Sequence, residues 1–397
     1  ALEWLALVHQ MSVARSPVAM WLADGRPAGA DAWRAADGSL NVGFFTDAWN
    51  QPLELRLPAR RGQAPSAHLA EVVRQGRRAP YDRGEPFDPN GPWPAGDDAL
   101  LSWMAHDGQH LIRFTKNAKA LAWLAADRLA LNDLLLEAER FRLMVHDSPT
   151  AQNYDRSLGW FASLVAARPN RGLPIDRAHA WGVDAIVAAY GFENDAWRTG
   201  WRPWLERYTD LMLASVMPSG LCMYSDNRQI LAGRHLGVQT FEVAFVTLMQ
   251  RALVEGVFRG VDKERASALR DVVLRSADYL YFGPPFQRGP NRWDPGTPSA
   301  GPTFQFAVAP LAPDGGLSSE PPYCDETRWG KGYLPADGRI ADLVETTYAY
   351  DVLAYADDWA RELGLPDAER FFARTLDLEQ GAASHAARFQ AMRREDA

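Results

Sequence analysis

Acids, an imidazole and aromatic rings gather where two helix-like patterns begin. The stretch from Asp176 to Asp184 contains His179, and Glu242 follows Gln239-Thr240-Phe241 in a similar setting. A carboxyl group among apolar residues can hold a raised pKa, and two carboxyl groups with different pKa values can serve as general acid and general base. Asp184 and Glu242 are therefore the first candidate pair of catalytic carboxylates, with His179 as a candidate base.

Basic and aromatic residues at other helix starts could bind a substrate. One cluster spans residues 110–117 and another spans residues 345–351. Helix N-termini also present free N–H groups and the positive end of the helix dipole to a ligand. These positions, with a long loop later in the chain, supply the candidate binding residues Arg113, Lys116, Arg177, Trp181, Trp293, Asp294 and Tyr348; Asp325 and Glu326 are reserve acids in the loop.

Capping and packing compete with function at the same positions. Asp176 and Thr240 precede helical patterns and are residue types typical of N-caps. A histidine flanked by apolar residues is more often a hydrogen-bonded core residue than a catalytic one. For the stretch His179–Asp184, in which Gly182 marks a position of close approach, function and packing are equally supported.

Amphipathic helices dominate the chain after residue 97. Apolar residues recur at helical spacing over 111–124, 125–141, 178–190, 197–216, 238–257, 265–282 and 340–363. The helices form pairs joined by short turns, and the pairs share no repeating consensus of the kind that indicates an open solenoid. We therefore expect a mainly α fold, an α/α toroid of helical hairpins in which the polar starts of the inner helices line one cleft.

The first 96 residues differ from the rest of the chain. Short alternating segments such as Leu53–Leu57 are separated by turn residues, and 80–94 is rich in proline. We predict a small β-rich N-terminal region and linker over 1–96, followed by the toroid domain over 97–397. The chain begins Ala1-Leu2 without an initiator methionine, so we interpret it as a processed or excised piece. Two alternatives stay open for the N-terminal region: it packs on the neighbouring domain, or it completes a domain that is truncated upstream.

A segment rich in proline and glycine, 283–337, interrupts the helical pattern. Disordered linkers are poor in aromatic residues, but this segment contains many, so we predict an ordered loop over one mouth of the helical domain. The chain has 15 tryptophans. Those at an inner-helix start or in this loop could stack on sugars: Trp181, Trp293 and Trp329. Those in helical patterns are expected to pack between hairpins: Trp123, Trp160, Trp197 and Trp359.

Composition excludes several classes of protein. With 397 residues, 47% of them hydrophobic and 23% charged, the chain is neither disordered nor a disulfide scaffold. Its net charge of −8 argues against binding to nucleic acid or to an anionic membrane surface. No apolar run reaches the ~18–20 residues that cross a bilayer. We expect Cys222 and Cys324 to be free thiols.

No sequence motif indicates a cofactor or a metal. A dinucleotide-binding loop, a Walker A loop and a zinc-binding HExxH motif are all missing from the sequence. His106 and His110 flank Asp107-Gly108, a turn signal, so a metal pair is not expected. Asp357, Asp358 and Glu362 are interpreted as solvated helix carboxylates.

Paired helices, polar-aromatic inner-helix starts and a long aromatic loop together resemble the six-hairpin α/α-toroid carbohydrate-active enzymes, over roughly residues 97–365. That group contains glycoside hydrolases and polysaccharide lyases, and some members place a β-region before the toroid. The resemblance implies an enzyme that cleaves glycosidic bonds of a poly- or oligosaccharide, in a secreted or periplasmic, bacterial setting. We favour hydrolysis, with Asp184 and Glu242 as the two carboxylates.

Two alternatives stay open. A polysaccharide lyase would abstract a proton beside a uronate carboxylate, with His179 or Tyr348 as base and Arg113, Lys116 or Arg177 neutralising the developing charge. A non-catalytic carbohydrate-binding or scaffold module would offer aromatic platforms without charged partners that converge on them.

Overall fold

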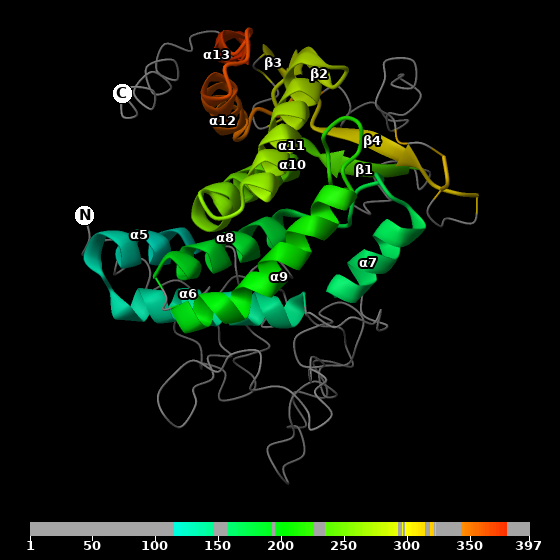
Figure 1. The fold of residues 1–397 in the computed structure, drawn as a ribbon. Helices are drawn as coiled ribbons and strands as arrows, with labels where there is room; N and C mark the ends of the chain where they lie inside the picture. Colours follow the sequence, from blue (N-terminus) through cyan, green and yellow to red (C-terminus); the bar gives the residue numbers. More distant parts are fainter. Residues whose placement is uncertain are drawn as a thin grey trace, which may run out of the picture. The chain divides into compact units, whose positions relative to one another are not determined.

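The computed structural model describes residues 115–145, 157–192, 195–224, 235–292, 296, 298–313, 318–320, 322 and 343–378. Helices make up most of this part of the chain, as the sequence predicted (Figure 1). The chain divides into two compact units, which are described separately: unit 1 contains 1–161 and 181–201, and unit 2 contains 162–180 and 202–397. The predicted β-rich region over 1–96 lies outside the described residues.

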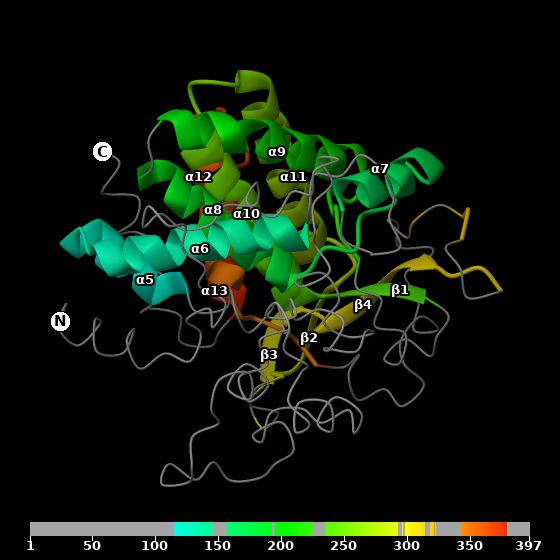
Figure 2. The ribbon, with the colours of Figure 1, turned by 90° about the horizontal axis from the view of Figure 1, so that it is seen from below.

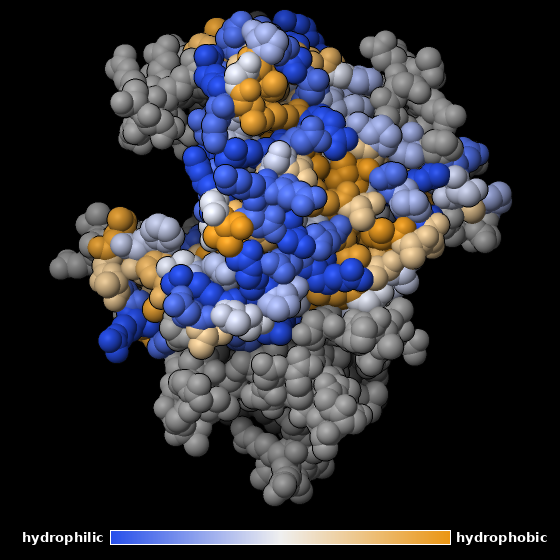
Figure 3. Space-filling model, in the orientation of Figure 1, coloured by the Kyte–Doolittle hydropathy of each residue, from blue (hydrophilic) through white to orange (hydrophobic). Residues whose placement is uncertain are grey.

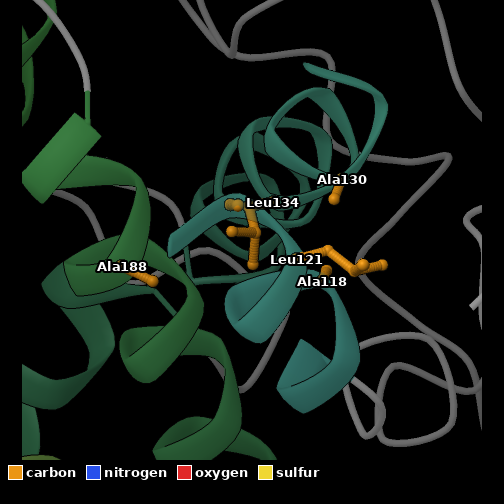
Figure 4. Close-up of a cluster of buried hydrophobic side chains, with 6 residues drawn as sticks. Ala118, Leu121, Ala130, Leu134 and Ala188 are labelled. Carbon is orange, nitrogen blue, oxygen red and sulfur yellow. The ribbon is translucent and has the colours of Figure 1, made fainter. Parts of the chain in front are cut away.

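Unit 1 contains the helical hairpin of α5 (Thr115–Ala125) and α6 (Arg128–Met144). The Asp127 side chain begins α6 by accepting a hydrogen bond from the Ala130 backbone N–H at 3.0 Å. Figure 4 shows the small apolar side chains through which the two helices pack with α8 (Arg177–Phe192), and the cluster consists of Ala118, Leu121, Ala122, Ala130, Leu134 and Ala188.

The buried carboxylate of Glu139 links α6 to the start of α9 through two hydrogen bonds. Oε1 of Glu139 accepts hydrogen bonds from the indole N–H groups of Trp197 at 3.1 Å and Trp201 at 2.9 Å. Both tryptophans lie near the start of α9 (Asp195–Ala214). This confirms the packing role predicted for Trp197. By contrast, Trp123 is 67% exposed and meets Phe192 edge-on, so the prediction that it packs between hairpins was wrong.

In the described part of unit 2, four α-helices follow α9. They are α10 (Thr240–Leu253), which continues into the π-helical turn η4 (Val254–Phe258), and α11 (Lys263–Phe282), α12 (Ala349–Glu362) and α13 (Glu369–Leu378). The helix α10 packs against α11 and α12, and α12 also packs against α13. Trp359 of α12 is fully buried, as predicted. A short helix, α7 (Leu158–Ala167), precedes α8.

The described residues of unit 2 form two small antiparallel sheets. Strand β1 (His235–Gln239) pairs with β4 (Gln305–Pro310), and β2 (Phe286–Pro290) pairs with β3 (Pro298–Pro302) (Figure 2). Three of these strands lie in 283–337, where the sequence predicted only a loop, so that prediction was wrong for 286–310. The prolines of this segment close the strand ends, where a missing N–H costs no inner ladder bond.

The start of α12 also differs from the prediction. Helical periodicity was expected from residue 340, but α12 begins at Ala349. Val344 instead bridges to Asn291 and Thr303, and Tyr348 has a left-handed backbone with φ 61°. A non-glycine residue in that region interrupts a right-handed helix. The helix start therefore lies next to the short strands.

The surface of the described residues is mixed. On the face drawn in Figure 3, hydrophilic residues cover most of the described surface and hydrophobic residues form smaller areas between them. Within the described ranges, no helix is long and apolar enough to cross a membrane.

Candidate active site

Two arginines and a phenylalanine connect three of the polar clusters that the sequence singled out. Nη1 of Arg177, in the first turn of α8, lies 3.4 Å from Oε1 of Glu242 in the first turn of α10. Arg292 donates to Oε2 of Glu345 at 3.1 Å, just before α12. Both guanidinium groups lie over the ring of Phe241, at 5.5 and 5.2 Å from its centroid. We call Asp176, Arg177, Phe241, Glu242, Arg292 and Glu345 the Glu242 cluster; all six belong to unit 2.

Backbone hydrogen bonds fix the start of α10, and with it Glu242. The Thr240 backbone N–H donates to the Phe304 carbonyl at 2.9 Å, and the Thr240 hydroxyl donates to the Thr303 carbonyl at 2.6 Å. Thr240 therefore does not cap α10 as predicted, because its side chain is hydrogen-bonded to the segment between β3 and β4. Next to these two hydrogen bonds, the Phe241 ring lies parallel to the Phe304 ring, with 6.4 Å between the ring centroids.

Glu242 is a buried carboxyl group with an unusual charge environment. Its side chain is 7% exposed, and no hydrogen-bond partner of its Oε2 lies among the described residues. Burial and, to a smaller extent, the negative charge of Asp176 raise the pKa of Glu242, whereas Arg177 and Arg292 lower it; with all these effects the pKa is about 7. Glu242 thus exchanges a proton near neutral pH, as a general acid must.

The start of α8 brings Asp176 and His179 together. Oδ1 of Asp176 accepts hydrogen bonds from the backbone N–H groups of Ala178 at 2.8 Å and His179 at 3.3 Å. The same oxygen lies 3.0 Å from Nδ1 of His179, whose side chain is buried. These bonds confirm that Asp176 caps α8. They also show a histidine oriented by a carboxylate, an arrangement found in both cores and active sites.

Arg292 and Glu345 are held by the backbone beside the short sheets. The Arg292 backbone N–H donates to the Val344 carbonyl at 3.0 Å, and the Glu345 backbone N–H donates to the Pro302 carbonyl at 2.9 Å. The Glu345 side chain is 0% exposed, and its Oε1 accepts from the Thr347 backbone N–H at 2.9 Å. Arg292 also lies over the Phe304 ring, 3.5 Å from its centroid. The pair is therefore a buried salt bridge next to Glu242.

Tyr348 packs beside α10. The centroid of its ring lies 4.6 Å from that of Phe245, one turn after Phe241.

On α11, Tyr281 is fully buried, and no hydrogen-bond partner of its hydroxyl lies in the described part of the chain. Burial raises the pKa of Tyr281, and the charges of Glu345 and Asp351 raise it further. Tyr281 is thus a neutral phenol within electrostatic reach of Glu345 and Asp351.

Asp184, the second predicted carboxylate, has a different environment. It forms a salt bridge with Lys119 of α5, and its side chain is 35% exposed. Gly182 packs against Phe141, because a Cβ at this glycine would lie 2.1 Å from Cδ2 of that ring. The close approach that the sequence indicated at Gly182 is therefore made by a core side chain. Trp181, Gly182 and Asp184 belong to unit 1, and His179 and Glu242 belong to unit 2.

Several candidates lie outside the described residues. These are Arg113, Trp293, Asp294, Asp325, Glu326, Trp329, Cys324 and the pair His106 and His110. Lys116 belongs to α5, but its side chain is not described.

Four residues of the Glu242 cluster were not among the candidate site residues: Asp176, which was predicted only as a cap, and Phe241, Arg292 and Glu345. Sequence signals for Arg292 and Glu345 can be named. Arg292 stands directly before the candidates Trp293 and Asp294, and Glu345 opens a polar stretch that the sequence did single out. A signal for both was therefore present. Their pairing across more than fifty residues left no local pattern.

Two other side chains that could do chemistry, those of Cys222 and Asp357, are buried and hydrogen-bonded. Cys222 is a free, buried thiol that accepts a hydrogen bond from Nε2 of Gln250 at 3.3 Å, and burial raises its pKa to about 12. A thiol of that kind is inert at neutral pH. Asp357 is 1% exposed and pairs with Arg361 at 2.9 Å, so its interpretation as a solvated carboxylate was wrong. Among the described residues, no group of three or more His, Cys, Asp or Glu side chains could hold a metal ion.

Comparison of the chain with protein-family models, curated proteins and solved structures gave no match. We therefore base the functional proposal on the chemistry of the Glu242 cluster.

Proposed function

We propose that this protein is a carbohydrate-active enzyme that hydrolyses glycosidic bonds of a poly- or oligosaccharide, with Glu242 as the general acid. One observation carries the proposal: a buried carboxyl group with a pKa of about 7 lies beside aromatic rings at the start of a helix. Glycoside hydrolysis needs such a group to protonate the leaving oxygen, and aromatic faces are suited to sugar rings.

The charge balance of the Glu242 cluster favours a neutral sugar. The carboxylates of Asp176 and Glu345 offset the guanidinium groups of Arg177 and Arg292, and Glu242 is largely protonated below pH 7. A protonated Glu242 therefore leaves these five side chains without net charge. Such a site can accept a neutral ring and its oxocarbenium-like transition state without a strong opposing field.

The proposed architecture is the α/α toroid with a β-rich N-terminal region. Helix pairs in each unit support it: α5 with α6, α10 with α11 and α12 with α13. The contacts between the starts of α8, α10 and α12 support the expectation that inner-helix starts converge. In this arrangement Trp181, Tyr348, Trp293, Arg113, Lys116 and Asp294 remain proposed sugar-binding residues, and Asp184 remains the second carboxylate proposed from sequence.

The lyase is the second candidate. Arg177 and Arg292 both lie over the Phe241 ring, and two guanidinium groups so placed could bind a uronate carboxylate. His179, oriented by Asp176, would then be the base. This reaction would develop negative charge, for which the acids of the Glu242 cluster are unfavourable.

The test is incubation with a panel of polysaccharides, with reducing ends and near-ultraviolet absorbance read in parallel. We expect reducing ends without absorbing products, and a loss of about 100-fold or more in the Glu242→Gln variant. Glu264→Gln is the matched control, because Glu264 is an exposed carboxylate in the first turn of α11.

Other outcomes overturn the proposal. Unsaturated, absorbing products that disappear in His179→Ala would establish the lyase. Binding to a polysaccharide without either product would leave only a binding module. Unchanged hydrolysis in Glu242→Gln would remove Glu242 from the reaction.

A further inference from the structure

Asp176 has a carboxylate close enough to Glu242 for its charge to raise the pKa of Glu242. Asp176 directly precedes Arg177, whose Nη1 lies 3.4 Å from Oε1 of Glu242. Its side chain is 22% exposed, so solvent reaches it, whereas the Glu345 side chain is fully buried. Of the acids around Glu242, Asp176 is thus the one that a water molecule can approach.

The Asp176 carboxylate is held in a fixed orientation. Its Oδ1 accepts hydrogen bonds from the backbone N–H groups of Ala178 and His179 and lies 3.0 Å from Nδ1 of His179, which itself accepts from the Asp176 backbone N–H at 3.2 Å. Hydrogen bonds of this kind stabilise the charged form of a carboxylate and restrict its rotation. A second signal points to a ligand in the same place, because Oε2 of the buried Glu242 has no hydrogen-bond partner among the described residues.

We infer that Asp176 is the second catalytic carboxylate, the general base that partners Glu242. The inference rests on the proposed hydrolase function and assigns the base to Asp176 in place of Asp184. Two carboxyl groups at neighbouring helix starts, one with a pKa raised by burial and one held by backbone N–H donors, match the division of roles in glycoside hydrolysis.

In the proposed reaction, the glycosidic bond is broken with acid and base assistance. Glu242 gives its proton to the glycosidic oxygen while the bond from that oxygen to the anomeric carbon breaks, and the electron pair stays on the leaving oxygen. A water molecule attacks the anomeric carbon, and its proton passes to the Asp176 carboxylate. Asp176 then returns a proton to solvent and Glu242 takes one up.

Asp176 could instead be only a helix cap, and the variants are chosen to separate the two roles. Asparagine and serine are both good N-cap residues, so Asp176→Asn and Asp176→Ser keep the cap and remove the base. Asp262→Asn is the matched control, because Asp262 caps α11 by accepting from the Arg265 backbone N–H at 3.1 Å. Circular dichroism and thermal unfolding check that each variant folds.

The experiment measures kcat against pH for the full chain on a polysaccharide that the wild-type protein hydrolyses. We expect kcat to fall by about 100-fold or more in Asp176→Asn and Asp176→Ser, and to stay within about threefold of wild type in Asp262→Asn. Added formate, a small carboxylate, should restore part of kcat in Asp176→Ser, which a structural role would not predict.

The pH profile gives an independent check on position. Wild-type activity should fall as pH rises through about 7, because Glu242 then loses its proton. Asp176 raises that pKa, whereas Arg177 and Arg292 lower it, so the fall should move to lower pH in Asp176→Asn.

Other results of these experiments would overturn either the assignment of Asp176 or the proposed hydrolase function. If Asp176→Asn keeps kcat within about threefold of wild type, Asp176 is only a cap and the inference is wrong. If Asp184→Asn loses activity and Asp176→Asn keeps it, the base is Asp184. A wild-type protein that releases no product from any polysaccharide would overturn the proposed function itself.

Discussion

Asp184 and Glu242 have similar sequence contexts and opposite environments. Each is an acid among apolar residues near a helix start. Asp184 is 35% exposed and forms a salt bridge with Lys119. Glu242 is 7% exposed, lies 3.4 Å from Arg177, and is also under the influence of Arg292, which pairs with Glu345. The difference teaches that an apolar sequence context does not by itself bury a carboxyl group, because burial depends on which segments far along the chain pack over it.

The largest expected difference is in the free energy of unfolding when the Arg292–Glu345 pair, beside Glu242, or the Lys119–Asp184 pair is broken. Removing one member of a buried pair leaves an uncompensated charge and costs about 3–5 kcal/mol, whereas a partly exposed pair contributes about 0–1 kcal/mol. We therefore expect Arg292→Met, which leaves Glu345 fully buried, to lower the free energy of unfolding far more than Lys119→Met.

Urea denaturation of both variants measures this difference. Equal, small losses in the two variants would show that Glu345 finds another partner or solvent. The contrast between the two regions would then be much weaker than the structure indicates.

An intermediate effect is expected in the pH dependence of stability. The pKa of Glu242 is about 7 in the folded protein and ~4.3 for an unperturbed glutamate, so the folded state binds more protons between these values. Glu242 therefore lowers the free energy of unfolding as pH rises through this window, by up to about 3 kcal/mol. Below pH ~4.3 the effect is absent.

Glu242→Gln removes this titration. The variant should gain stability relative to wild type from pH 4.5 to 7.5, measured as the difference between their urea denaturation curves. A difference that does not change with pH would mean that Glu242 ionises in the folded state as it does in the unfolded chain.

The smallest expected effect tests the packing role of Gly182. An added Cβ would overlap the Phe141 ring, and overpacking of a core typically costs about 1–3 kcal/mol. Gly182→Ala should therefore be destabilised. Gly200→Ala is the matched control in unit 1, because nothing lies within 4 Å of a Cβ there, and it should gain about 0.5–1 kcal/mol as a helix-interior alanine. Thermal unfolding compares them, and a stable Gly182→Ala would reopen a ligand-binding role at this glycine.

Helical periodicity predicted much of the fold. The helices α5, α6, α8, α9, α10 and α11 lie close to the predicted ranges because each carries an apolar stripe that can be recognised locally. The strands β2, β3 and β4 were missed, since they are short and bounded by prolines that also signal loops. The start of α12 was misplaced because the backbone at Tyr348 is set by tertiary contacts.

The candidate site was predictable only in part. Glu242 could be selected because its apolar neighbours are contiguous in the sequence, and Arg177 because it opens a helix. The contact between Arg292 and Glu345 joins positions far apart in the chain, and no local pattern marks it. Asp176 was predicted only as a cap, since the charge it exerts on Glu242 depends on the meeting of α8 and α10.

The most direct test of the central claim is a titration of the Glu242 side chain by NMR, with carbon-13 in the carboxyl group and Glu242→Gln to assign the signal. The account predicts a midpoint of about 7, because burial and Asp176 outweigh Arg177 and Arg292. A midpoint near ~4.3, the ordinary value for glutamate, would contradict it, and Glu242 would then be an ionised partner of Arg177 rather than an acid able to donate a proton.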